Sequence, residues 1–108
     1  MAREQFQTLT EPMYYILMAL LDECCGVDIM EKVQRLSHDR VHVGPGTLYA
    51  MLSKFEENGV IRMTGQEGRR KSYVITDRGK QMLQEEYQRL KTMTEDGSWV
   101  LEHAEWAR

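Results

Sequence analysis

The sequence has little of the features that define several protein classes. Its only cysteines are Cys24 and Cys25, and adjacent cysteines provide neither a disulfide framework nor the spacing of a metal site. No run of about 18 apolar residues occurs, so we expect no membrane-spanning helix. Residues 13–21 are apolar but short and follow acidic residues, which argues against a secretory signal. We expect a cytoplasmic protein with two partly buried thiols, or alternatively a redox switch.

Motifs of the common enzyme classes are also missing. The sequence has no phosphate-binding or dinucleotide-binding glycine motif, and neither cysteine has a histidine nearby in sequence to activate it. His38 and His42 are four residues apart, but Pro45 and a polar loop argue against one helical metal-binding face. We therefore expect no enzyme, no catalytic residues, no cofactor and no metal.

Charge is distributed unevenly along the 108 residues, although the net charge is only −3. Residues 40–80 carry eight Lys or Arg against four Asp or Glu. Residues 1–39 carry three against seven, and residues 81–108 carry three against six. A local basic patch can bind phosphates even on an acidic protein. The middle third is therefore the candidate nucleic-acid interface.

A helix with two different faces is predicted in this middle third. Pro45 suits the first helical position, and Asn58-Gly59 suits the end. One face is an apolar stripe formed by Leu48, Met51, Leu52 and Phe55. The opposite face is small, hydroxylated and basic, which suits a DNA major groove, while an ordinary amphipathic helix is the alternative. Its candidate DNA-contacting residues are Thr47, Tyr49, Ser53 and Lys54.

A β-hairpin is predicted after this helix, from alternating segments at residues 60–64 and 71–75. We expect its inward-facing residues to be Ile61, Met63, Tyr73 and Ile75. A glycine-containing turn precedes Arg69, Arg70 and Lys71, which could contact phosphates or enter a minor groove. The alternative is a solvated hairpin tip whose charges prevent edge pairing.

Two helices are expected before the candidate recognition helix. Thr10 can cap the first, which is apolar over much of its circumference, and Asp28 can cap the second. Val41 and Val43 alternate with polar residues and allow a very short strand. Three helices followed by a hairpin with a basic tip predict a mainly α-helical winged helix-turn-helix domain over residues 1–76.

A final helix is expected over residues 77–108, with Thr76-Asp77 as its start. Its apolar stripe is too long for a small domain to cover, so we expect a second chain to cover it, as in a coiled coil. Asp96-Gly97 leaves open whether this region is one helix or two. The predicted homodimer contacts, from the first and last helices, are Ile16, Leu20, Leu83, Tyr87, Leu90 and Leu101.

Several motifs together resemble the PadR family of transcriptional regulators. They are residues 9–11, the run Gly44-Pro45-Gly46-Thr47-Leu48-Tyr49, the segment 55–61, and the wing segment 68–79. The resemblance implies a bacterial, nucleoid-associated repressor that dimerises through its first and last helices and releases DNA on a signal. It assigns Thr47, Tyr49 and Lys54 to the recognition helix and Arg69, Arg70 and Lys71 to the wing. The sequence departs from the family at residues 25–28.

The resemblance also implies an effector site at the dimer interface, lined by aromatic residues of the last helix. Trp99 and Trp106 are seven residues apart and share one helical face. The candidate pocket for a small hydrophobic effector comprises Met18, Met93 and Trp99. Packing against the partner chain is the alternative role. We predict a homodimeric regulator that binds double-stranded DNA at a palindromic operator, or alternatively a winged-helix module that binds proteins.

Overall fold

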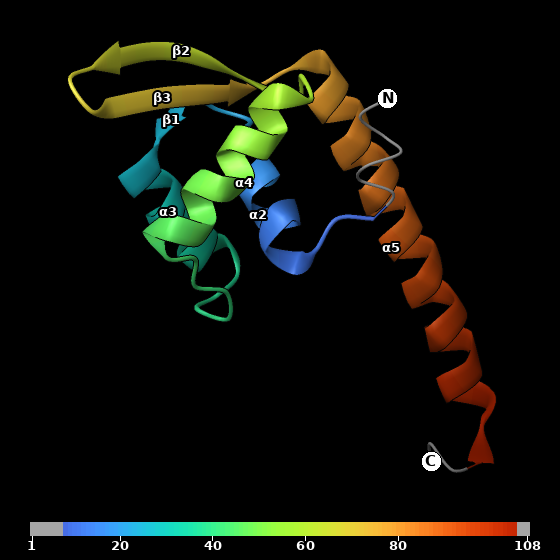
Figure 1. Ribbon diagram of the computed structural model, residues 1–108. Helices are drawn as coiled ribbons and strands as arrows, with labels where there is room; N and C mark the ends of the chain where they lie inside the picture. The colour runs from blue at the N-terminus through green and yellow to red at the C-terminus, as the bar shows by residue number, and fades with distance from the viewer. Residues whose placement is uncertain (1–7, 106–108) are drawn as a thin grey trace.

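The computed structural model of the chain describes residues 8–105. Its elements are the helix α2 (Glu11–Ala19), the strand β1 (Cys24–Cys25), the helices α3 (Gly26–Leu36) and α4 (Pro45–Glu57), the strands β2 (Ile61–Glu67) and β3 (Arg70–Ile75), and the helix α5 (Asp77–His103). The first three helices pack beneath the hairpin β2–β3, and α5 leaves this body at its far side (Figure 1). This is a winged-helix arrangement, as the sequence predicted.

Local sequence signals determine where most helices begin and end. The Thr10 hydroxyl accepts a hydrogen bond from the Met13 N–H at 3.3 Å, and the Thr76 hydroxyl accepts one from the Gly79 N–H at 3.1 Å. Gly59, at φ +72°, follows α4 in the left-handed region. These predictions are confirmed. The predicted cap at Asp28 is wrong, because α3 already begins at Gly26.

A three-stranded antiparallel sheet has the order β1-β3-β2. The hairpin is confirmed, but its turn is shorter than predicted, because β2 extends to Glu67 and β3 starts at Arg70. Strand β1 was missed. The short strand suggested near Val41 and Val43 is wrong, since both residues lie in a loop and only their side chains are buried. Met63 is exposed rather than inward-facing, because β2 is an edge strand with a neighbour on one side only.

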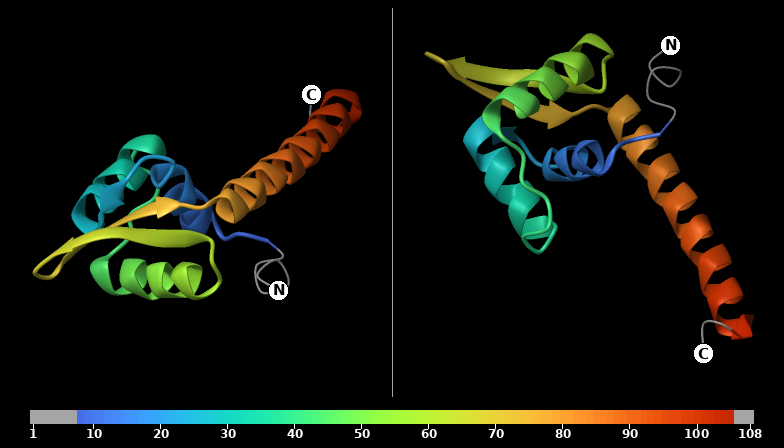
Figure 2. Two further views of the ribbon diagram at one scale, coloured as in Figure 1. Left: turned by 90° about the horizontal axis from the view of Figure 1, so that it is seen from above. Right: turned by 60° about the horizontal axis from the view of Figure 1, so that its bottom comes forward.

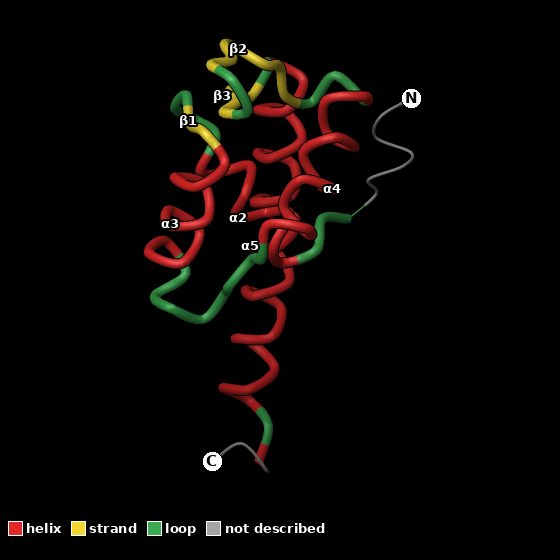
Figure 3. The backbone as a smooth tube through the Cα atoms, turned by 60° about the vertical axis from the view of Figure 1, so that its left-hand side comes forward, coloured by secondary structure: helices red, strands yellow, loops and turns green. Residues whose placement is uncertain are grey.

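The core of the body is formed within a single chain by side chains from every helix and from the sheet (Figure 3). The broad apolar surface of α2 is covered there, since Ile16, Leu17 and Leu20 are fully buried. Both cysteines are buried thiols, as expected. The residues with the largest fully buried side chains include Phe55, Ile29, Leu48, Leu52 and Ile61.

Helix α5 is one continuous helix through Gly97. Its buried residues are Gly79, Met82, Leu83 and Glu86, and all later residues of the helix are exposed or half-buried. We call residues 8–86 the head and residues 87–103 the arm. The arm projects away from the head in every view (Figure 2). The radius of gyration is accordingly 16.1 Å, against about 13 Å for a compact domain of this length. Within residues 8–105, no helix is long and apolar enough to cross a membrane.

Candidate nucleic-acid interface

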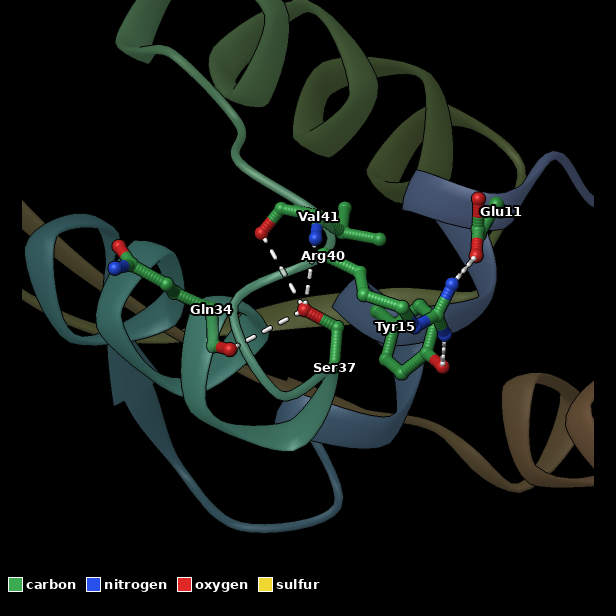
Figure 4. A network of polar contacts seen from close by, with 6 residues as sticks. All are labelled: Glu11, Tyr15, Gln34, Ser37, Arg40 and Val41. Carbon is green, nitrogen blue, oxygen red and sulfur yellow. Dashed lines mark hydrogen bonds and ion pairs between the residues drawn. The ribbon is translucent and has the colours of Figure 1, made fainter.

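The loop between α3 and α4 sets the position of α4, and a buried hydroxyl organises it. Ser37 is fully buried; its hydroxyl accepts from the Val41 N–H at 2.9 Å and donates to the Gln34 carbonyl at 3.2 Å (Figure 4). His38 and Asp39 follow with φ of 53° and 68°, a left-handed conformation that reverses the chain. The sequence gives no periodic signal for this turn, because it depends on a side chain bonding to the backbone four residues away.

Arg40 fastens the same loop to α2. Its guanidinium donates to a Glu11 carboxylate oxygen and to the Tyr15 hydroxyl, each at 2.8 Å (Figure 4). The hydrogen bond to Glu11 is the main cause that raises the pKa of Arg40. One basic residue of the middle third is therefore used inside the head. His42 lies 3.0 Å from the Asp39 carbonyl, and within residues 8–105 no three His, Cys, Asp or Glu side chains are placed to hold a metal ion.

Helix α4 presents the two faces that its sequence predicts. Leu48, Leu52 and Phe55 are buried, and Met51 is half-buried against the core. The four candidate DNA-contacting residues all lie on the exposed side, together with Gly46 and Ala50: Thr47, Tyr49, Ser53 and Lys54. The helix therefore offers hydroxyl and amine groups to solvent along its length.

Tyr49 packs closely against the start of α3. A Cβ atom at Gly26 would overlap the Tyr49 hydroxyl and would lie 3.0 Å from the ring carbon Cζ. Only glycine leaves room for the ring at this position. The contact fixes the Tyr49 side chain between the two helices of the helix-turn-helix. Sequence reasoning treated residues 25–28 only as a departure from the family, and missed that Gly26 makes room for Tyr49.

The wing and the two helices meet at a shallow hollow of about 370 Å³. The hollow joins the predicted recognition helix to all three predicted wing cations. The start of α3 also borders it, and no side chain caps the N–H groups there. The hollow is thus surrounded by groups that attract anions. Its lining residues are Cys25, Gly26, Val27, Tyr49, Arg69, Arg70 and Lys71.

Arg70 differs from its two basic neighbours because it has partners within the chain. Its Nε donates to the Cys25 sulfur at 3.3 Å, and its terminal nitrogen lies 3.8 Å from an Asp28 carboxylate oxygen. The Cys25 hydrogen bond, followed by the charges of Cys25 and Asp28, raises the pKa of Arg70. Arg69, in the turn, and Lys71 are exposed. Arg70 therefore holds the wing against α3, a role that sequence separation hid.

The residues predicted for the dimer interface fall into two groups. Ile16 and Leu20 are fully buried in the head and Leu83 is 9% exposed, so they have little or no surface to offer a partner. Their assignment to a subunit interface does not fit this burial, because α5 and the other helices already cover α2. Tyr87 and Leu101 are more than half exposed on the arm, and Leu90 is half-buried.

The three residues predicted for an effector pocket are not brought together within one chain. Met18 packs against the core of the head, whereas Met93 and Trp99 are exposed on the arm. Met93 and Trp99 are also six residues apart, so they lie on different faces of the helix. Trp106 lies outside the described residues.

Comparisons with known proteins agree with this geometry. The family described as "Transcriptional regulator PadR-like family" matches residues 16–85. A transcriptional regulator from Clostridium thermocellum is similar at a TM-score of 0.68 and 19% identity, over 82% of this chain and 86% of that chain. RosR of H. salinarum gives 0.63 at 18% identity, over 87% and 97%. The complex hsRosR-S4 gives 0.64 at 20%, over 94% and 99%. These similarities show a shared fold, and no curated protein matches the sequence.

Proposed function

This chain belongs to the PadR-like family of transcriptional regulators, and from this premise we propose that it binds double-stranded DNA as a homodimer. The observation that carries the proposal is the hollow at which Tyr49 of α4 meets the exposed cations Arg69 and Lys71 of the wing. The rest of the chain is acidic, so the positive potential is concentrated where the exposed face of α4 begins.

In the proposed complex, α4 lies in the major groove and the wing follows the backbone. Thr47 and Tyr49 contact phosphates or base edges through their hydroxyls, and Lys54 contacts a phosphate or a guanine. Arg69 and Lys71 supply affinity that does not depend on sequence. Arg70 contributes mainly by holding the wing in place, although its side chain is 67% exposed and can also approach a phosphate.

A second copy of the chain is the proposed cover for the arm. The spacing of Leu83, Tyr87, Leu90, Thr94, Gly97 and Leu101 alternates between four and three, as in a coiled-coil seam. Leu101 is 51% exposed and Trp99 is 63% exposed in the single chain. Pairing of two arms would bury this surface and would place two α4 helices on a palindromic operator.

Repression and response to an effector complete the proposal. A dimer bound across a promoter excludes other proteins from that DNA, so the default role is repression. A small hydrophobic effector would bind between paired arms near Trp99, because Met18, Met93 and Trp99 do not meet in one chain. The exposed indole of Trp99 would report such binding as a change in fluorescence, and Trp99→Phe would remove that part of the signal.

Selection of duplexes from a random pool by the purified protein tests the proposed function directly. We expect a palindromic consensus, because two-fold symmetric readers select two-fold symmetric sites. An enriched sequence without symmetry would contradict the dimeric complex. No enrichment at low ionic strength would contradict DNA binding and would favour the protein-binding alternative.

The wing is tested by replacing Arg69 and Lys71 with alanine and measuring affinity for the selected duplex as a function of salt. We expect the slope of log affinity against log salt to fall by about two, one for each lost phosphate contact. The matched control replaces Lys80 and Lys91, two exposed cations of α5, and should leave the slope unchanged. An unchanged slope in the wing variant would show that the wing does not contact DNA.

A further inference from the structure

Glu86 is a charged side chain that the proposed DNA complex does not use, and it is 99% buried. One carboxylate oxygen accepts a hydrogen bond from the Leu9 N–H at 3.1 Å. The carboxylate also receives two hydrogen bonds from Arg89, at 2.8 Å from Nε and at 2.7 Å from a terminal nitrogen. Its hydrogen bond is the main cause that raises the pKa of Arg89. The carboxylate therefore links α5 to the segment that precedes α2.

The position of Glu86 along α5 is the important point. It is the last buried residue of the helix, and the arm begins immediately after it. Leu9, its partner across the joint, is itself buried in the core of the head. The hydrogen bond therefore connects the core of the head to the place where the arm departs.

Apolar packing does not fill this joint. A hollow of about 320 Å³ lies between the segment before α2, α2 itself and the first turn of the arm, lined by Leu9, Glu11, Tyr14, Tyr15 and Leu90. Because side chains do not fill that space, they leave the arm some freedom to tilt. A directional hydrogen bond between buried partners restricts tilt more than a loose apolar contact does.

We propose that Glu86 is a positioning residue that fixes the angle between head and arm, and thereby fixes the separation of operator half-sites that the dimer accepts. This inference rests on the proposed function. The arm of 17 residues is about 25 Å long, so a tilt of about 10° at the joint displaces its end by about 4 Å. That displacement is about the rise of one base pair, about 3.4 Å.

The chemistry of the site explains why a glutamate suits this role better than an apolar residue. A leucine could fill the volume, but it would leave the buried Leu9 N–H without an acceptor. A carboxylate can accept from Leu9 and from both Arg89 donors together, and the partly exposed Arg89 balances its charge. A glutamine has one acceptor oxygen and presents its own donors, so it cannot satisfy all three partners.

The test compares wild type, Glu86→Gln and Arg89→Gln on duplexes that carry the selected half-sites at the preferred spacing and at one base pair more or less. We expect wild type to discriminate sharply between spacings. In Glu86→Gln the ratio of affinities should fall by about tenfold, the size of one lost discriminating contact. Arg89→Gln should lower it in the same direction, because Arg89 orients the carboxylate. The matched control Glu95→Gln removes the same charge from the exposed arm and should keep the wild-type ratio.

Helicity and light scattering accompany these measurements, since a structural defect alone would lower affinity for all spacings equally. If Glu86→Gln does not fold, the result for Arg89→Gln decides, because that side chain is partly exposed. Folded, dimeric variants with the wild-type spacing ratio would overturn the role of Glu86 and leave the proposed function intact. Wild-type protein that ignores paired half-sites would overturn both, and that failure is visible before any variant is made.

Discussion

The two parts of α5 carry similar apolar spacing but have opposite environments. In the first, Asp77–Glu86, Met82 and Leu83 are buried against the head. In the second, the arm, Trp99 and Leu101 are at least half exposed. The helix itself does not explain this difference, because the pattern runs on through both parts. What differs is whether other elements of the same chain lie opposite. Periodicity therefore predicts which face is apolar, and it does not predict what covers that face.

The contrast also separates two kinds of stability. Residues of the head contribute to folding of a single chain, whereas apolar residues of the arm contribute only when a second chain is present. Monomeric proteins rarely expose contiguous apolar surface of this kind. Substitutions in the head should therefore change the free energy of unfolding, and substitutions in the arm should change the dimer dissociation constant. The predictions below test this division.

The largest effect is expected from a charge placed on the apolar stripe of the arm. Leu101→Glu should dissociate the dimer, because a carboxylate would be buried without a partner in the seam. Duplex affinity should fall by about 10²–10⁴-fold, the gain that linking two half-site readers provides. Thr92→Glu adds the same charge on the opposite face of the helix and should do neither. Light scattering and duplex titration measure both quantities, and a dimer that survives Leu101→Glu would contradict the proposed seam.

A comparable effect, but on folding, is expected from the core of the head. Phe55 is fully buried, so Phe55→Ala should lower the free energy of unfolding by about 3–5 kcal/mol. Tyr87→Ala removes an aromatic ring of similar size from the arm, where the side chain is 54% exposed, and should change unfolding of the head by under about 1 kcal/mol. Denaturant titration below the dimer dissociation constant measures both. Equal losses would mean that head and arm fold as one unit.

A smaller loss is expected from a glycine in the buried part of α5. A Cβ atom at Gly79 would overlap the Val60 carbonyl oxygen and the Ile75 side chain. The carbonyl belongs to the backbone and already accepts from the Thr76 N–H at 3.0 Å, so it cannot easily move. Gly79→Ala should therefore cost about 1–3 kcal/mol of stability by overpacking, measured by thermal unfolding. A neutral effect would show that α5 is free to shift against the sheet.

Features set by neighbouring residues were predicted from the sequence. The caps at Thr10 and Thr76, the stop at Gly59 and the apolar stripe of α4 each depend on a few adjacent positions. Such signals are local, so the chain of three helices and a hairpin could be inferred with nearly correct boundaries. The exposed face of α4 followed from the same periodicity.

Features set by distant contacts were not predicted. Strand β1 consists of two residues, too few for a periodic signal, and its pairing of Cys24 with Tyr73 joins positions 49 apart. The tie between Arg70 and Cys25 spans 45 positions, and the joint between Glu86 and Leu9 spans 77. The burial of α2 within the head likewise depends on how α5 packs, which no single segment encodes.

The smallest expected effect is a gain, and it comes from the matched glycine on the arm. Gly97 has no heavy atom within 4 Å of the position that a Cβ atom would occupy, in contrast to Gly79 on the same helix. Gly97→Ala should therefore stabilise the arm by about 0.5–1 kcal/mol, since alanine restricts the unfolded backbone and favours helix. Amide hydrogen exchange of residues 95–101 should show the added protection. Because Gly97 lies on the predicted seam, the dimer dissociation constant is measured in parallel and should not rise. A weaker dimer would show that the two arms approach so closely at Gly97 that a methyl group separates them, and the open space in one chain would then be filled by the other.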